Sequence, residues 1–528
     1  MSPGLGRGKA YVHKDALQRG DGFYEIDEAQ AADEVARFRK AVEHVAGKLE
    51  GMESEVRTEI DDGLSEVFVA HAQMIGDASL KEEVERAIRE ELVSAAAAVK
   101  IVFRRWEHRF KSMDSDVARQ KSEDVRDLAR QLVASLAGVR QHEFEDLPEG
   151  CILVAKRLLP SDTLYLSRKN TAGVVLEEGG VGSHAALFAC EIGLPGVAQI
   201  ENATQTIKPG EQLLVDADQA EVVVNPSERD VERFVQRERN QEKARSEALR
   251  NAFEPAVTSG GQQVNVYANI GDADDALAAF ERGAEGVGLY RIEQVYLGKE
   301  TPPDAETLAE EISNALKPAD GHPVYVRLLD VGADKALPFM DKLREGNPAL
   351  GLRGIRFLAH HPELLDTQLR TLLKLSTEVD LHILVPMVTL PADVALVNER
   401  LKKLAADGGV GKVPPVGAMI ETPAAALAAG VLAEQVDFLS FGTNDLTQYA
   451  FAADRENAAV DDYFDDTHDA VFRMLELVHN DLPDMPLSVC GELAGRPEAV
   501  ARLLACGITT LSVAPPLVAE TKQAVRQA

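Results

Sequence analysis

The sequence predicts a multidomain α/β protein, in which an α/β domain with an inserted helical bundle is followed by a (β/α)8 TIM barrel. Three observations predict this fold class. Apolar residues recur at helical spacing over residues 24–145, short β-type runs fill residues 146–227, and β-type runs alternate with helical stretches over residues 254–528. The chain has 528 residues, enough for about three domains, and 45% of them are apolar, so it can bury large cores.

The first part of the chain combines one strand-like segment with a long helical region. Residues 1–23 are punctuated by glycine around the segment GKAYV and are assigned to the α/β domain. Residues 24–145 repeat apolar side chains at three- and four-residue steps, which is typical of helices that bury one face. The repeating positions are Val35, Phe38, Val42, Val45 and Leu49 near the start, and Val125, Leu128 and Leu132 near the end.

The next part changes from helical to β-type patterning. Residues 146–227 contain the short runs CILVA, AGVVLEE, QLLVDA and AEVVVNP, separated by Gly, Pro and Asp. We expect them to form a compact α/β domain together with residues 1–23. Residues 228–253 are densely charged with few apolar positions, which predicts an exposed linker helix.

Eight β-type runs, each followed by a helical stretch, lie within residues 254–528. They are VNVYANI, GVGLY, PVYVRLLD, GLRGIRF, LHILVPMV, VGAMIE, VDFLSFG and LSVCG. Eight such units are typical of a TIM barrel, whose active residues lie at the carboxyl ends of the strands.

The charge balance is strongly acidic, with a formal net charge of −31. Such a surface repels nucleic acid and anionic membranes, and it favours basic partners or metal cations. A need for high solubility, or a salt-rich habitat, would explain the same charge equally well. We expect no nucleic-acid partner.

The cysteines and the hydropathy pattern indicate a cytoplasmic protein with no membrane insertion. The start of the chain lacks the apolar core of a signal peptide, and no stretch reaches the roughly 18 apolar residues of a membrane span. The cysteines show no CxxC spacing, which argues against a zinc site or a redox pair. There are four: Cys151, Cys190, Cys490 and Cys506.

A histidine stands at the expected start of a helix in the segment GGVGSHAALFACEIGLPG, residues 179–196. Ser183 can cap a helix that begins at His184, and Gly193 followed by Pro195 ends it. The positive end of the helix dipole disfavours imidazolium and attracts an anion. A nucleophilic histidine and a phosphohistidine both need that environment. The alternative is an ordinary exposed histidine after a glycine-rich turn.

Charged side chains follow several predicted strands of the barrel, where the fold places its active residues. Four guanidinium groups converging there would bind phosphate and carboxylate bidentately. They belong to Arg291, Arg327, Arg353 and Arg455.

Two carboxylates and a thiol also follow predicted strands. Glu421 ends VGAMIE, and Asp445 follows VDFLSFG beside Asn444, an amide donor. Two carboxylates together with substrate oxygens are a usual way to hold Mg²⁺. Cys490 in LSVCG stays protonated at neutral pH and could donate a proton. Taken singly, such residues can equally anchor loops or fill the core.

These motifs resemble those of enzyme I, the phosphoenolpyruvate-protein phosphotransferases of the bacterial sugar phosphotransferase system. The resemblance extends in order over nearly the whole chain. The motifs that carry it are SPGLGRGKA, GGVGSHAALFACEIGLPGV, GAEGVGLYRIE, RLLDVGADKALPFM, NPALGLRGIR, ETPAAA, FGTNDLTQYAFAADREN and VCGELAGRPE.

The resemblance implies a reaction and a role for each candidate residue. His184 would take the phosphoryl group of phosphoenolpyruvate and pass it to a histidine of the carrier protein HPr, with Cys490 as the proton donor that completes pyruvate. Glu421 and Asp445 would hold Mg²⁺. The substrate contacts would be Arg291, Arg327, Arg353, Asn444, Asp445, Arg455 and Lys335, with Arg353 and Lys335 near the transferring phosphate.

The resemblance also implies how the domains work together. The α/β domain would be a swivelling phosphohistidine domain, the bundle of residues 24–145 would dock HPr, and the chain would form a homodimer. Ala528 ends the chain short of the usual family length, which bears on the dimer contact.

The chain departs from the family pattern at four uncharged positions. Threonines that are usual in the family are replaced by Gly182, Ile292 and Leu328, and Ala333 replaces a usual glycine. These changes leave every charged residue of the candidate site in place, and they bear on the transfer rate and the choice of carrier.

Two alternatives remain open. Pyruvate phosphate dikinase and phosphoenolpyruvate synthase share the barrel and the histidine domain, but they carry a large ATP-binding domain before the histidine, and here 183 residues precede His184 without a Gly-rich ATP loop. The other alternative is a catalytically altered paralogue that senses phosphoenolpyruvate and signals by binding. The intact charged residues, His184 and Cys490 argue against it.

Overall fold

A computed structural model describes the chain apart from several short segments, and it divides into two units, Met1–Arg239 and Asn240–Ala528. Outside the described residues lie 1, 3, 14–23, 60–61, 112–115, 139–143, 145–146, 169–170, 180–185, 187, 190–191, 297–298, 300, 333–336, 338, 340–344, 410 and 456. Among the described helices, none combines the length and the apolar character needed to cross a lipid bilayer.

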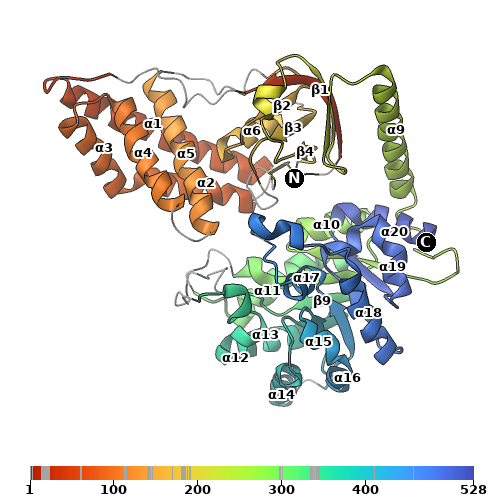
Figure 1. The fold of residues 1–528 in the computed structure, drawn as a ribbon. Coiled ribbons are helices and arrows are strands. Elements are labelled where there is room, and N and C mark those ends of the chain that lie inside the picture. Colours follow the sequence, from red (N-terminus) through yellow and green to blue (C-terminus); the bar gives the residue numbers. More distant parts are fainter. Residues whose placement is uncertain are drawn as a thin grey trace. The chain divides into compact units, whose positions relative to one another are not determined.

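The first unit contains a six-stranded sheet in the order β4-β3-β2-β1-β5-β6 (Figure 1). Strands β1 to β4 pair in parallel, whereas β5 pairs antiparallel with both β1 and β6. The strands are β1 Leu5–Val12, β2 Ile152–Ala155, β3 Gly173–Leu176, β4 Gly196–Val197, β5 Gln212–Asp216 and β6 Glu221–Val224. Each of the predicted β-type runs is therefore a strand, and the two-residue β4 is one that the sequence pattern did not indicate.

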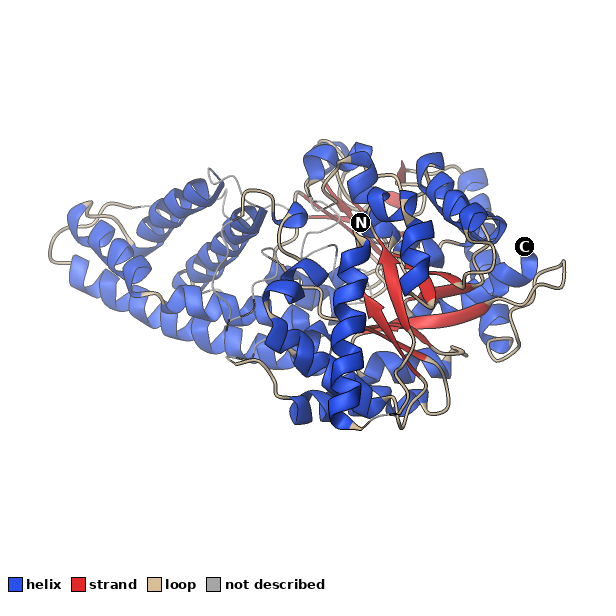
Figure 2. Ribbon diagram, turned by 90° about the horizontal axis from the view of Figure 1, so that it is seen from below, coloured by secondary structure: helices blue, strands red, loops and turns tan. Residues whose placement is uncertain are grey.

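The sheet is accompanied by short helices and by the predicted helical bundle, the helices at the far left of Figure 2. The bundle contains α1 Ala31–Glu59, α2 Asp62–Gly76, α3 Ala78–Glu90, α4 Ala95–Lys111 and α5 Asp116–Leu136, and the sheet carries α6 Pro160–Arg168 and α8 Ala203–Thr206. All eight apolar positions predicted for the bundle are buried, from Val42 at 8% exposure to Leu49, Leu128 and Leu132 at 0%. The helical periodicity is thus confirmed by the core that it forms.

The charged segment after the sheet forms one continuous helix, α9 Glu228–Arg250. It spans the boundary between the two units, and most of its side chains are exposed. Near its end, Ala248 and the following Ala252 are buried against Ala519. The predicted helix is confirmed, and its role as a linker stays a prediction.

The second unit is a closed barrel of eight parallel strands, in the order β10-β11-β12-β13-β14-β7-β8-β9. The strands are β7 Asn265–Ile270, β8 Val287–Arg291, β9 Val324–Arg327, β10 Leu381–Val385, β11 Val416–Ile420, β12 Phe438–Phe441, β13 Leu487–Val489 and β14 Thr510–Val513. The main helices are α10 Ala273–Glu281, α11 Ala305–Leu316, α12 Ile355–His360, α13 Pro362–Leu375, α14 Pro391–Gly408, α15 Pro423–Leu427, α16 Ala429–Leu432, α17 Thr443–Phe451, α18 Asp469–Asp481, α19 Pro497–Ala505 and α20 Val518–Gln527. The predicted TIM-barrel class is confirmed.

One predicted barrel strand is wrong, and one real strand was missed. The run GLRGIRF forms a turn followed by α12, because Gly354 adopts a left-handed φ of +55°. A short buried apolar run has no periodicity that separates a strand from a helix. The missing strand is β14, whose four residues lie between Gly507, with φ +79°, and a proline pair. The predicted sixth, seventh and eighth strands are therefore β11, β12 and β13.

Candidate active site

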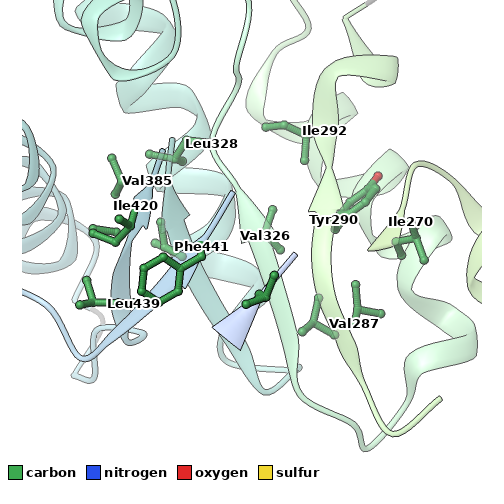
Figure 3. Close-up of a cluster of buried hydrophobic side chains, with 14 of the residues drawn as sticks. Ile270, Val287, Tyr290, Ile292, Val326, Leu328, Val385, Ile420, Leu439 and Phe441 are labelled. Carbon is green, nitrogen blue, oxygen red and sulfur yellow. The ribbon is translucent and has the colours of Figure 1, made fainter. Parts of the chain in front are cut away.

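The alternation of side chains along the barrel strands decides which residues reach its interior. Tyr290, Val326 and Ile420 belong to the large core between barrel and helices (Figure 3). A second, smaller core contains the interior residues Leu289, Leu384, Met419, Phe438 and Cys490. Because successive side chains of a strand point to opposite faces, Arg291, Arg327 and Glu421 point inward with Cys490. They lie at the carboxyl ends of their strands, a region that we call the mouth.

The same alternation explains two of the departures from the family pattern. Ile292 and Leu328 are fully buried in the core that faces the helices (Figure 3). Their side chains therefore contribute packing and do not line the mouth. Gly182 and Ala333, the other two departures, lie outside the described residues.

Arg327 is anchored between two acidic side chains at the mouth. Its Nη2 donates to Glu293 Oε1 at 3.0 Å, and its Nη1 lies 3.3 Å from Asp330 Oδ2. Glu293 Oε1 also accepts the backbone N–H of Asp330 at 2.9 Å. Burial lowers the pKa of the Arg327 guanidinium, but the negative charges around it, Glu293 and Asp330 above all, together outweigh burial, so the pKa is raised. Arg327 thus keeps its charge in a buried position, as an anion-binding group must.

Arg353 bridges Asp330 to Asp445. Its Nη2 donates to Asp330 Oδ2 at 2.9 Å, and its Nη1 donates to Asp445 Oδ1 at 2.9 Å. Nη1 also lies 3.3 Å from the Tyr449 hydroxyl, which in turn donates to the Ala349 carbonyl. Arg353 therefore lies in the turn before α12 and not in a strand. The turn positions its side chain at the mouth, in contact with Asp445.

Glu421 is a buried carboxyl group with 1% exposure at the end of β11. Its Oε2 accepts the backbone N–H of Met387 at 2.7 Å. Burial first, and then the nearby carboxylates of Asp445 and Asp330, raise its pKa to about 8. A buried carboxyl crowded by other carboxylates fits a site that binds a cation.

The donor set consists of carboxylate oxygens, which hard cations such as Mg²⁺ take as ligands. Oxygen ligands are the ones that this ion prefers, and it keeps several water or substrate oxygens. The described residues contain no group of three or more His, Cys, Asp or Glu arranged to hold a metal ion. Glu421 and Asp445 would therefore act with oxygens from a substrate.

Arg291 and Arg455 add positive charge to the mouth. Arg291 retains contact with solvent but is surrounded by other side chains. The pKa of its guanidinium is lowered, first by desolvation and then by the positive charge of Arg327. Arg455 contributes a further repulsion to Arg291, and its backbone N–H donates to Gln448 Oε1 at 3.2 Å. Guanidinium groups that repel one another across an open site favour a bound anion.

The Asn444 amide is oriented by Glu492. Asn444 Nδ2 donates to Glu492 Oε1 at 3.1 Å, and Asn444 Oδ1 accepts the Glu492 backbone N–H at 2.9 Å. These reciprocal bonds fix which end of the amide donates, and they leave its second N–H to meet a ligand.

Cys490 lies in the barrel interior next to these charges, with 3% exposure. Ser440 Oγ donates to its Sγ at 3.4 Å, and Sγ donates weakly to the Phe441 carbonyl at 3.6 Å. Burial above all raises the pKa of the thiol to about 11, and Glu421, Arg327 and Arg291 are its charged neighbours. The thiol is thus fully protonated at neutral pH.

Two predicted site residues, His184 and Lys335, lie outside the described residues. Around the histidine, Ala186, Phe188 and Ala189 are helical. The predicted end of that helix is confirmed, because Gly193 has φ +63° and the Leu194 N–H donates to the Ala189 carbonyl at 2.8 Å.

The structure brings to the mouth four further residues that the sequence pattern did not indicate: Glu293, Asp330, Tyr449 and Glu492. Glu293 and Asp330 follow Arg291 and Arg327 by two and three residues. Their position just after an apolar strand run was the signal that could have indicated them. Nothing in the sequence pattern showed which guanidinium group each of these two carboxylates contacts.

Comparison with known families agrees with this architecture. A family model for the phosphoenolpyruvate-binding domain of phosphoenolpyruvate-utilising enzymes matches residues 243–528. Models for the N-terminal and mobile domains of the same enzymes match residues 1–121 and 147–220. Together they account for most of the chain.

Curated relatives are similar over almost the whole length. A phosphoenolpyruvate-protein phosphotransferase of Haloferax volcanii is 35% identical over 502 residues, which is 93% of this chain and 87% of the relative. One of Priestia megaterium is 33% identical over 94% of this chain and 87% of the relative. A solution structure of an Enzyme I protein is 30% identical, with 46% of this chain and 97% of that chain covered and a TM-score of 0.39.

Proposed function

Since this chain belongs to the phosphoenolpyruvate-protein phosphotransferases, we propose that the mouth of its barrel binds phosphoenolpyruvate and that His184 accepts the phosphoryl group. The enzyme transfers the phosphoryl group of phosphoenolpyruvate to protein. In the proposed sequence, phosphohistidine 184 then passes the group to a histidine of an HPr-type carrier.

One observation carries the assignment of the substrate site. Arg327 and Arg353 lie at one barrel mouth, linked by salt bridges through Asp330, and the neighbouring Arg291 is repelled by Arg327. Phosphoenolpyruvate carries a phosphate and a carboxylate, and guanidinium groups bind both in bidentate fashion. The overlap of this anion site with the carboxyl groups of Glu421 and Asp445 supports a substrate that binds together with a cation.

Glu421 and Asp445 would hold Mg²⁺, which when bound neutralises charge on the phosphate and carboxylate oxygens. The arginines orient the phosphate for in-line attack by a neutral His184 imidazole nitrogen. Catalysis of this kind is mostly positioning and charge stabilisation, because the transition state of phosphoryl transfer is loose.

Proton transfer completes the product. The nitrogen–phosphorus bond forms as the bond between phosphorus and the enol oxygen breaks, which leaves the enolate of pyruvate. The Cys490 thiol gives its proton to the methylene carbon of the enolate, and the resulting thiolate recovers a proton from water. A thiol with a pKa near 11 holds its proton until the strongly basic enolate appears.

His184 serves two partners in this sequence, so its domain must meet them in turn. We propose that the helical bundle, α1 to α5, docks the carrier and that the chain acts as a homodimer. The docking role is supported by the family, whose named activity is transfer to a protein, and by the division of the chain into separate units, whereas the homodimer rests on the family resemblance alone.

The test measures pyruvate released from phosphoenolpyruvate by the full chain with Mg²⁺ and HPr. Asp445→Asn removes one carboxylate charge with little change in volume, and we expect a rate loss of about a hundredfold or more, as for other lost charge-stabilising groups. Strong chelation of Mg²⁺ should have the same effect. Turnover that persists in both cases would show that the metal site is wrong.

A further inference from the structure

Arg353 occupies both oxygens of a residue that we propose as a metal ligand. Its Nη1 lies 2.9 Å from Asp445 Oδ1, and its Nη2 lies 3.3 Å from Asp445 Oδ2. Both groups are buried, with side-chain exposures of 10% and 8%. This bidentate pair is the strong form of a charged hydrogen bond, and it holds a positive charge against both of the oxygens that a metal ion would bind.

The rest of the surroundings keep Arg353 within reach of the mouth. Asp330 Oδ2 accepts from the same Nη2 at 2.9 Å, and Asp330 Oδ1 lies 3.5 Å from Nε. The backbone N–H of Asp330 is in turn fixed by Glu293 at 2.9 Å. If the bond to Asp445 breaks, Arg353 therefore still has Asp330 as an anchor, and its Nη1 becomes available to another anion.

We propose that Arg353 is a latch that competes with Mg²⁺ for Asp445 and is released when the phosphate of phosphoenolpyruvate takes its Nη1. The latch makes each ligand bind more tightly in the presence of the other. This inference rests on the proposed function, because it takes Asp445 as a metal ligand and the mouth as the phosphate site.

The coupling follows from the exchange of partners. When the metal ion binds alone, it displaces the buried Arg353 guanidinium from Asp445, so that Arg353 keeps Asp330 but loses one of its two carboxylate partners, which is costly. When both ligands bind, the phosphate replaces Asp445 as the second anionic partner of Arg353, and that cost is offset. Coupling between two ligands is reciprocal and typically amounts to roughly 5- to 150-fold in affinity.

The test measures Mn²⁺ binding to the full chain by electron paramagnetic resonance, with and without a phosphonate analogue of phosphoenolpyruvate that cannot transfer its phosphorus group. For the natural chain we expect the analogue to tighten Mn²⁺ binding by roughly fivefold or more. In Arg353→Met, Mn²⁺ should bind more tightly by a similar factor without the analogue, and the analogue should then add little.

Arg291→Met is the matched control, because it removes one positive charge from the same mouth without touching Asp445. A general effect of the lost positive charge would raise the Mn²⁺ affinity of both variants. The contribution of the latch is the additional rise in Mn²⁺ affinity seen in Arg353→Met alone. Arg353→Lys, which keeps the charge but loses the bidentate fork, should give an intermediate affinity.

Equal Mn²⁺ affinities for Arg353→Met and Arg291→Met would overturn the latch, and so would an undiminished effect of the analogue in Arg353→Met. Asp445→Asn separates this failure from that of the proposed function. If Asp445→Asn binds Mn²⁺ as tightly as the natural chain, the metal site itself is misassigned.

Discussion

Cys490 and Cys506 are two buried thiols of the barrel unit that differ in their surroundings. Burial raises the pKa of each to about 11. Cys506 follows α19 and donates weakly to the Phe472 carbonyl within the core that faces the helices. Cys490 lies in the barrel interior beside Arg291, Arg327 and Glu421. The raised pKa of each thiol is therefore mainly a result of burial, and the position of the thiol decides whether its proton can be used.

Cys490→Ala is expected to slow pyruvate formation by about 10²- to 10⁴-fold, the usual contribution of a positioned general acid. The Michaelis constant for phosphoenolpyruvate should change little, because the thiol does not hold the anion. Pyruvate release is measured in a coupled assay with excess HPr.

Cys506→Ala is the matched control for this variant, since it removes a thiol of equal burial and pKa away from the mouth. It should turn over at close to the natural rate. Near-normal turnover of Cys490→Ala would return Cys490 to the role of core filler.

At the scale of the elements, strand alternation explains which site residues could be predicted from the sequence. Arg291, Arg327, Glu421 and Cys490 end or follow apolar strand runs, so the barrel pattern places them at the mouth. Arg353 was selected from a run that proved to be a turn and a helix, so the residue was placed at the mouth on the basis of a wrong element.

The remaining features could not be predicted because they depend on contacts between distant segments. Asp330 gains its role from Arg353, 23 residues further on in the same β/α unit, and Glu492 gains its role from Asn444 of the preceding unit. The strand β14 escaped notice because two of its four residues, Thr510 and Ser512, are polar, so it lacks the apolar run that indicated the other barrel strands.

The opposite end of the barrel interior carries an aromatic group around His382 of β10. The His382 ring stacks on Tyr325 with centroids 4.4 Å apart, and the edge contact with Phe438 is 5.8 Å. The pKa of His382 is lowered, chiefly by burial and to a smaller extent by the positive charge of Lys412. The carboxylates of Asp380 and Asp437 raise this pKa but do not outweigh burial. The folded barrel thus prefers the neutral ring.

This preference predicts a pH-dependent stability. As the pH falls through about 6.5, the unfolded histidine takes up a proton while the folded one does not, so the unfolded state is favoured. The stability that depends on neutral His382 is therefore present above that pH and is lost as the pH falls toward the lower, folded pKa.

We expect the midpoint of urea unfolding of the barrel to fall more between pH 7.5 and pH 5.5 in the natural chain than in His382→Phe. That variant keeps the stacking but cannot titrate, and the carboxyl groups common to both chains cancel in the comparison. Equal falls would show that His382 does not contribute to the pH dependence.

For the whole molecule, the division into two units separates the two halves of the proposed reaction. The first unit carries His184 in its sequence, and the second carries the arginines and carboxylates of the mouth. Each has its own hydrophobic core, so each is expected to fold alone.

A fragment of residues 1–253 should therefore be inert toward phosphoenolpyruvate, yet it should accept a phosphoryl group in reverse from phosphorylated HPr. Transfer between two histidines is nearly thermoneutral, and it needs the carrier-docking surface without the barrel. Labelling the fragment with each donor measures both properties. If the fragment takes phosphate from phosphoenolpyruvate, the substrate site is not in the barrel. If it folds but refuses several phosphorylated HPr proteins, the helical bundle does not dock that carrier.

The most direct test of the central claim is the labelling of the full chain by phosphoenolpyruvate that carries radioactive phosphorus, in the presence of Mg²⁺. We expect one labelled site, with the acid lability and alkali stability of a phosphohistidine. The label should be absent from a folded His184→Ala variant. Undiminished labelling of His184→Ala would contradict the account, because another residue would then be the acceptor.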